Sequence, residues 1–151
     1  MQVLKYWCNF AKRLQLQKLY FPPTNNSPEI CFSPEEKLFF MRGISTPEDV
    51  REMYYPVIEW FRNYIDSLVN GNSNEYTIDS PLRFQVDLKY FNSSSAKFLF
   101  DIFLELKRLE VSGIHVTVEW IYDVEDPDLQ EAGSDIASLV EMQFTYISKT
   151  R

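Results

Sequence analysis

The sequence contains few of the residues on which catalytic and nucleotide-binding sites usually depend. Its 151 residues include one histidine, two cysteines and four glycines. Cys8 and Cys31 are too few for a disulfide framework and wrongly spaced for a zinc site, and so few glycines argue against a glycine-rich phosphate loop. No apolar run approaches a membrane span, and the first residues lack the apolar core and cleavage site of a signal peptide. We therefore expect a cytoplasmic protein that does not insert into membranes.

Charge is unevenly distributed along the chain, whose net charge is −7. The first 18 residues contain no acid and four bases, Lys5, Lys12, Arg13 and Lys18. Residues 110–148 show the reverse, because they contain nine acids and no Lys or Arg. A surface of this sign repels phosphate backbones, so we expect no binding to nucleic acid. The simplest interpretation of the acidic half is a solvated face.

Hydrophobic patterning predicts alternating strands and helices. Runs of alternating or β-branched residues predict five strands, at 30–33, 37–42, 82–91, 114–123 and 142–148, the first two forming a hairpin. Apolar residues at helical spacing predict three helices, beginning near residues 45, 93 and 126. In the second helix the residues selected by this spacing are Phe98, Leu99, Ile102, Phe103, Leu106 and Leu109. Strand–helix–strand alternation implies right-handed crossovers between parallel strands. We expect one α/β domain with a mostly parallel sheet of about five strands, about three helices and the order β-β-α-β-α-β-α-β.

The first predicted helix has recognisable ends. Ser45 or Thr46 is the expected N-cap, because Pro47 and two acids follow. Asn70-Gly71 is a typical helix stop. Pro56 lies inside the helical pattern, and we expect a kink or a break there.

Three consecutive serines, Ser93 to Ser95, follow the strand that ends near residue 91. Asn92 and Ser93 stand where a helix needs a cap, and Asn and Ser are residues that satisfy free helix N–H groups. The same position suits a phosphoryl group, because free N–H groups and the positive end of the helix dipole stabilise anions. Lys97 lies one turn after Ser93 and is placed to pair with a phosphate. The residues alone leave capping and phosphorylation as two open interpretations.

No group of residues forms a convincing catalytic centre. His115 lies in a predicted strand, where an ordinary sheet residue is the simpler interpretation. No G-x-S-x-G motif is present, and Ser94 to Lys97 matches only the bare S-x-x-K pattern. Four acids could bind a divalent cation, but their spacing fits no calcium loop and favours a solvated helix start: Asp123, Asp126, Asp128 and Glu131. We expect no enzymatic activity, no metal and no cofactor.

Four segments, taken in order, resemble the SiaC family of bacterial regulatory phosphoproteins. They are PTNNSPEICF, STPEDVREMYYPVIEWF, LKYFNSSSAKFLFDIF and VTVEWIYDVEDPDLQEAGSDIA. The resemblance covers about residues 19–148 and implies the STAS-like fold of anti-sigma-factor antagonists. It divides the chain into a basic extension, 1–18, and a SiaC-like regulatory domain, 19–151. The extension is a short amphipathic helix, a poorly ordered segment or the product of a start codon assigned too far upstream, and we favour the last two.

The resemblance also implies roles for the serines. In the family the hydroxyl after the Asn of an N-T-S-S pattern is the phosphoacceptor, which here corresponds to Ser93, with Ser in place of the usual Thr. Ser94 is the second choice as acceptor. Asn92, Ser94, Ser95 and Lys97 are then expected to support the phosphate or contact partners.

The function that the resemblance implies is partner switching without catalysis. A serine/threonine kinase phosphorylates the domain and a PP2C-like phosphatase reverses the reaction. Only one phospho-form binds the output protein, which in the best-known system is a diguanylate cyclase that promotes cyclic-di-GMP signalling and biofilm formation. The alternative is a constitutive protein-interaction domain in which the serines only cap the helix.

Overall fold

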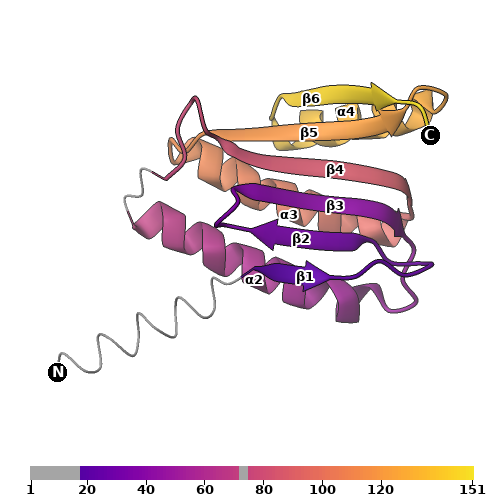
Figure 1. Ribbon diagram of the computed structural model, residues 1–151, viewed down its shortest axis with the longest axis horizontal. Helices are drawn as coiled ribbons and strands as arrows, with labels where there is room; N and C mark the ends of the chain where they lie inside the picture. The colour runs from indigo at the N-terminus through magenta and orange to yellow at the C-terminus, as the bar shows by residue number, and fades with distance from the viewer. Residues whose placement is uncertain (1–17, 72–74) are drawn as a thin grey trace.

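In the described part of the chain, alternating apolar residues form a six-stranded sheet, and three amphipathic helices cover one of its faces (Figure 1). The computed structural model describes residues 18–71 and 75–151. The elements in chain order are β1 (Leu19–Phe21), β2 (Glu29–Ser33), β3 (Leu38–Ser45), α2 (Val50–Asn70), β4 (Leu82–Phe91), α3 (Ser93–Val111), β5 (Val116–Asp123), α4 (Pro127–Val140) and β6 (Phe144–Lys149). The α/β class is as predicted, and so are the three helices found among these described residues. Within the described residues, no helix is long and apolar enough to cross a membrane.

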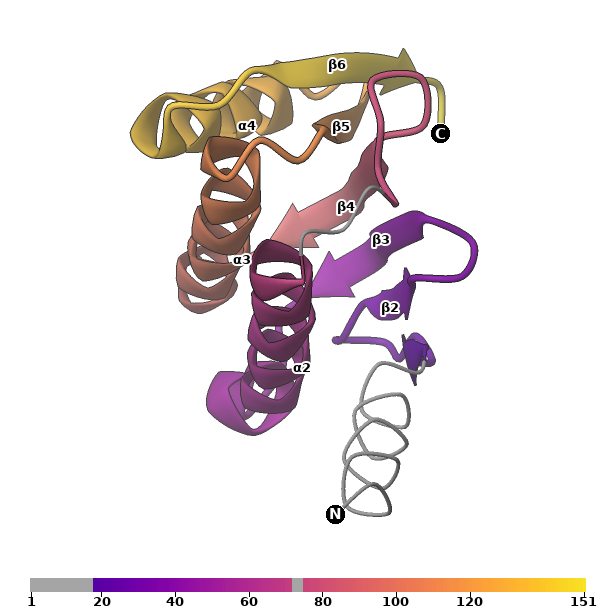
Figure 2. The same cartoon turned by 90° about the vertical axis from the view of Figure 1, so that its left-hand side faces the viewer.

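The strands lie in the sheet in the same order as in the sequence. β1, β2 and β3 pair antiparallel, whereas β3, β4, β5 and β6 pair parallel. The three parallel crossovers contain α2, α3 and α4, which all lie on the same face of the sheet (Figure 2). Because parallel strands end at the same edge, the starts of all three helices gather there.

β1 is a strand that the sequence did not predict. It pairs with β2 from Leu19↔Phe32 to Phe21↔Ile30, which raises the strand number from about five to six. Leu19 and Phe21 pack against the core, so this edge strand extends the covered area of the sheet. The predicted extension, 1–18, falls outside the described residues except for Lys18.

The core lies between the sheet and the helices, and the periodicity predicted it well. Along β4 the alternate residues Leu82, Phe84, Val86 and Leu88 are buried, but Tyr90 is exposed, because the register against β3 shifts between Gly43 and Ile44. α3 buries all six apolar residues that the helical spacing selected: Phe98, Leu99, Ile102, Phe103, Leu106 and Leu109. Aromatic pairs connect the layers, including the tilted pair of Phe32 with Phe61 and the edge-on pair of Phe84 with Phe103. Pairs of this geometry add specific orientation to the area they bury.

The start of α2 differs from the prediction. Ser45 is the last residue of β3, where it pairs with Phe91, and Asp49 caps the helix by accepting a hydrogen bond from the Glu52 N–H at 3.0 Å. Pairing with β4 extends β3 beyond its predicted end and shifts the helix start by several residues. The helix continues through Pro56 without a break, and it ends at Asn70 as predicted. Pro56 is exposed, so the carbonyl that loses its helical bond faces water.

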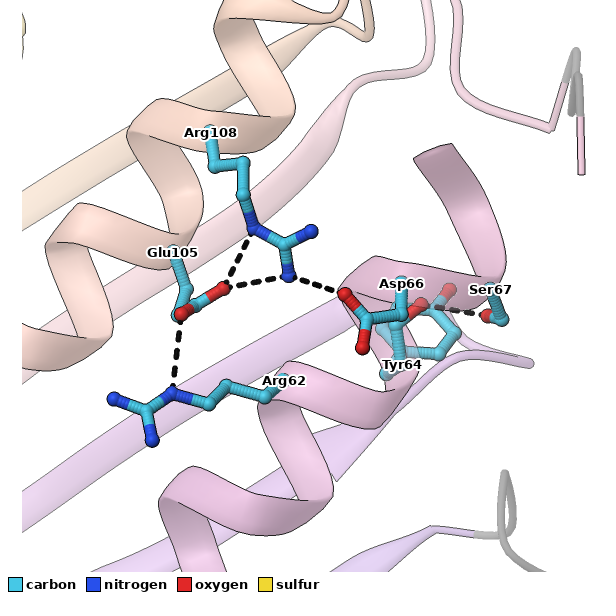
Figure 3. Close-up of polar contacts among 6 residues, drawn as sticks. All are labelled: Arg62, Tyr64, Asp66, Ser67, Glu105 and Arg108. Carbon is cyan, nitrogen blue, oxygen red and sulfur yellow. Dashed lines mark hydrogen bonds and ion pairs between the residues drawn. The ribbon is translucent and has the colours of Figure 1, made fainter. Parts of the chain in front are cut away.

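A chain of ion pairs holds α2 and α3 together at their outer surface (Figure 3). Glu105 accepts from Arg62 at 3.1 Å and from Arg108 at 2.8 Å, and Arg108 also pairs with Asp66 at 2.7 Å. Glu105 is 15% exposed, while its partners are more accessible. Exposed pairs of this kind contribute little energy singly, but a network fixes the relative orientation of two helices more effectively.

Candidate functional site

The turn that contains the predicted phosphoacceptor, Asn92 to Ser94, lies at the sheet edge where the parallel strands end. We call it the acceptor turn. β4 ends at Phe91 and α3 begins at Ser93, so Asn92 is the whole connection between them. The turn between β1 and β2 reaches the same edge, because the Asn26 carbonyl accepts from the Thr46 N–H at 2.8 Å. Segments that are far apart in the sequence therefore meet around Asn92.

The three serines have different environments. The Asn92 side chain caps α3 by accepting from the Ser95 N–H at 2.9 Å. Ser93 and Ser94 are the first two residues of the helix, and both are exposed. Ser95 is fully buried on the same helical face as Phe98. A protein partner or a kinase can reach the first two hydroxyls, whereas Ser95 supports the site only from beneath.

The start of α3 retains free hydrogen-bond donors. The Asn92 N–H donates to the Ser45 carbonyl at 3.1 Å and the Ser95 N–H is bound by the cap. In the described part of the chain, the N–H groups of Ser93 and Ser94 have no acceptor. Lys97 is exposed one turn away, 5.6 Å from the Phe98 ring, and makes no ion pair within residues 18–71 and 75–151. Two amides, a helix dipole and an ammonium group are thus available to a phosphate on Ser93.

A buried chain of hydroxyls lies directly under this turn. The Tyr54 hydroxyl and Ser45 Oγ are 2.6 Å apart, Ser45 Oγ donates to Ser95 Oγ at 2.8 Å, and Ser95 Oγ donates to the Ser45 carbonyl at 2.9 Å. Since the single Ser45 proton is directed at Ser95, Tyr54 is the donor to Ser45. Burial raises the pKa of Tyr54 to about 12, so its hydroxyl stays protonated at neutral pH.

Sequence reasoning missed Tyr54 and Ser45 as supporting residues of the site. The signal for Tyr54 was present, since it lies three and four residues before the apolar Val57 and Ile58, on the buried face of α2. A tyrosine on such a face needs a partner for its hydroxyl.

The surface around Ser93 combines exposed aromatic and acidic groups. Tyr90 and Tyr55 are each 57% exposed, and the Tyr55 ring lies 5.8 Å from that of Phe98. Val124, 51% exposed, follows β5 at the same edge. The acidic residues Glu48 and Asp49, which precede α2, are also exposed. Tyrosines with a polar rim are typical of protein-binding surfaces.

The other predicted site residues do not join this turn. His115 precedes β5 instead of lying within it, and its carbonyl accepts from Leu82 at the opposite end of β4. Asp126 caps α4 by accepting from the Leu129 N–H at 3.1 Å, which confirms the helix-start interpretation for this residue. No group of three or more His, Cys, Asp or Glu residues in the described ranges is placed to hold a metal ion.

The capping geometry predicts different effects for two neighbouring substitutions. Asn92→Ala is expected to lower the free energy of unfolding by about 1 kcal/mol, because the Ser95 N–H loses its acceptor. Ser93→Ala is expected to change it by less than about 0.5 kcal/mol, because the exposed Ser93 side chain makes no hydrogen bond in the described part of the chain. Urea unfolding of both variants tests this. Equal losses would show that Ser93 has a structural role that the geometry does not reveal.

Comparison with known proteins identifies relatives over most of the chain. The family described as SiaC family regulatory phosphoprotein matches residues 21–149. An uncharacterised protein of Pseudomonas aeruginosa (strain UCBPP-PA14) is 30% identical over 108 residues, which are 72% of this chain and 78% of that protein. Crystal structures of P. aeruginosa SiaC share the fold at 24% identity. The apo form has a TM-score of 0.71 and covers 89% of this chain and 99% of its own. The form in complex with the diguanylate cyclase SiaD, which SiaC activates, has a TM-score of 0.75 and covers 87% and 99%.

Proposed function

The chain belongs to the SiaC family of regulatory phosphoproteins, and from this premise we propose that it is a non-enzymatic switch whose phosphoacceptor is Ser93. A kinase phosphorylates the domain, residues 19–151, in the cytoplasm, and a PP2C-like phosphatase removes the phosphate. The unphosphorylated form binds and regulates an output protein. Ser94 is the second choice as acceptor.

One observation carries the choice of Ser93. Its hydroxyl is exposed at the first position of α3, beside two unbonded N–H groups and the exposed Lys97. A kinase can reach a hydroxyl in this position, and the surroundings stabilise the dianion once it forms. The alternative, that the serines only cap the helix, has less support because Asn92 is the residue that caps it.

Phosphorylation would act on partner binding through charge at the centre of the surface. Tyr90 lies two residues before Asn92, and the Tyr55 ring lies 5.8 Å from that of Phe98; both tyrosines are exposed and available for burial against a partner. A phosphate buried there without a matching cation costs about 3 kcal/mol or more, which corresponds to about 100-fold in affinity. That is sufficient to switch a micromolar complex off.

A diguanylate cyclase is the output partner that we propose. The complex of P. aeruginosa SiaC with the cyclase SiaD supports this choice, because that protein shares the fold of this chain. We propose that the cyclase contacts the exposed residues at the start of α3, where Ser93 and Ser94 lie.

Peptide mass spectrometry of the protein from its native cells tests the proposal. A phosphate on the Asn92–Lys97 peptide, localised to Ser93 and removed by a PP2C-type phosphatase, is the expected result. The Ser93→Ala chain, expressed in the same cells, is the control for localisation. Absence of phosphate across several growth conditions would contradict the switch and leave a constitutive interaction domain.

A further inference from the structure

Three polar side chains lie in an otherwise apolar part of the core. Tyr54 comes from α2, Ser45 from the end of β3 and Ser95 from the first turn of α3, and each is 0% exposed. Their hydroxyls form a continuous chain with spacings of 2.6 and 2.8 Å. Among the described residues, no buried side-chain polar atom lacks a partner. Burying hydroxyls is unfavourable unless each is bonded, so an apolar replacement would have been simpler if only stability mattered.

The chain of hydroxyls ends on the backbone of the acceptor turn. The Ser45 carbonyl accepts both from Ser95 Oγ, at 2.9 Å, and from the Asn92 N–H, at 3.1 Å. One carbonyl thereby fixes the residues on either side of Ser93 and Ser94. On the other side, the Tyr54 ring stacks on Phe98 at 5.2 Å and an interplanar angle of 7°, one turn further along α3. The exposed serines are held from beneath at both ends of the first turn.

We infer that Tyr54, Ser45 and Ser95 are positioning residues, which hold the Asn92–Ser94 turn in the shape that presents Ser93. Ser45 is the central residue of this hydrogen-bond chain. Its hydroxyl accepts from Tyr54 and donates to the Ser95 hydroxyl, and its carbonyl accepts from the Ser95 hydroxyl. The use of the turn for phosphorylation rests on the proposed function, whereas the positioning does not. This role explains why the third serine of the run is buried while the first two are exposed.

The same helix offers a matched control. Tyr64 also lies in α2 and also has a buried hydroxyl paired at 2.6 Å, in this case with Tyr76. It is ten residues from Tyr54, about 15 Å along the helix axis, and bonds nothing in the acceptor turn. Tyr54→Phe and Tyr64→Phe therefore delete the same group from similar environments, one under the turn and one distant from it.

Hydrogen exchange followed by mass spectrometry on the full chain tests the inference. In Ser45→Ala and Tyr54→Phe we expect the peptide spanning residues 91–98 to exchange about ten-fold faster than in the wild type. Tyr64→Phe should leave that peptide unchanged. Equal acceleration in Tyr54→Phe and Tyr64→Phe, or none in Ser45→Ala, would overturn the inference and reduce the hydroxyls to general core packing.

A double variant separates positioning from stability. In Ser45→Ala alone, the buried Tyr54 hydroxyl loses its acceptor, so the protein is expected to be less stable. Adding Tyr54→Phe removes the unsatisfied group and is expected to restore the melting temperature, while exchange at residues 91–98 stays fast. If the double variant regains both the melting temperature and the slow exchange of the wild type, the positioning role is contradicted.

The outcome for phosphorylation is read independently. Phosphate on Ser93 in native cells is expected to decrease in Ser45→Ala and to remain at the wild-type level in Tyr64→Phe. If the wild type carries no phosphate but the exchange pattern is as expected, the positioning is supported and only the proposed function fails. If phosphate is present and the exchange is unchanged in Ser45→Ala, the proposed function is supported and the positioning fails.

Discussion

Ser93→Asp is expected to weaken binding to a diguanylate cyclase of the same organism by about 100-fold and to leave the fold intact. The substitution places a carboxylate at the exposed first residue of α3, three residues after the exposed Tyr90. A docked partner would remove water from this carboxylate. The aspartate carries one negative charge and a phosphate about 1.5 to 2, so phosphorylation should weaken binding at least as much. Isothermal titration calorimetry with the purified cyclase measures the affinity.

Ser93→Asp should weaken partner binding without lowering the stability of the fold. An acidic residue in the first turn of a helix interacts favourably with the helix dipole, by about 0.3–1 kcal/mol. Ser93→Asp is therefore expected to melt at the wild-type temperature or slightly above it. A loss of binding caused by unfolding would instead lower the melting temperature.

Two controls determine whether the position or the charge alone is responsible. Ser134→Asp adds the same charge at an exposed serine within α4, away from the sheet edge, and should bind like the wild type. Ser93→Ala removes the acceptor without adding charge and should bind normally, too. Wild-type affinity in Ser93→Asp would contradict a phosphorylation switch at this residue, and equal weakening in Ser134→Asp would indicate a nonspecific charge effect.

The helix and strand pattern was predictable because it depends on local periodicity. All six apolar residues selected on α3 are buried, and the hairpin of β2 and β3 is present. The end of β3 was not predictable in the same way, because it is set by pairing with β4, whose paired residues lie 45 or 46 positions later in the chain. That pairing moved Ser45 from the expected cap of a helix to the centre of a buried hydrogen-bond chain.

The environments of the three serines were only partly predictable from the sequence. Ser95 lies three and four residues before Phe98 and Leu99, which places it on the apolar face of α3. Its burial was therefore open to prediction from helical spacing. Its partners were not, because Tyr54 and Ser45 are brought to it by the stacking of α2 on α3 and by the register of β3 against β4.

Gly133→Ala is expected to destabilise the fold by about 1 kcal/mol, although alanine is the better helix former. A Cβ at this position of α4 would lie 2.6 Å from atoms of the Trp120 ring. The ring cannot retreat freely, since it is 1% exposed and its Nε1 donates to the Leu129 carbonyl at 3.0 Å. Overpacking of this kind typically costs about 1–3 kcal/mol, more than the propensity gain of about 1 kcal/mol.

Guanidinium unfolding of Gly133→Ala and of the neighbouring Ser134→Ala measures this effect. Ser134 is exposed, so its replacement should be neutral or slightly stabilising. If both variants gain stability, α4 does not pack against Trp120 as closely as the geometry indicates.

The contact between Gly133 and Trp120 also bears on the acceptor turn, because Trp120 meets the Phe91 ring edge-on at 6.0 Å and Phe91 directly precedes the capping Asn92. A side chain at residue 133 would thus disturb the strand end from which Ser93 is presented, on the side opposite to Tyr54.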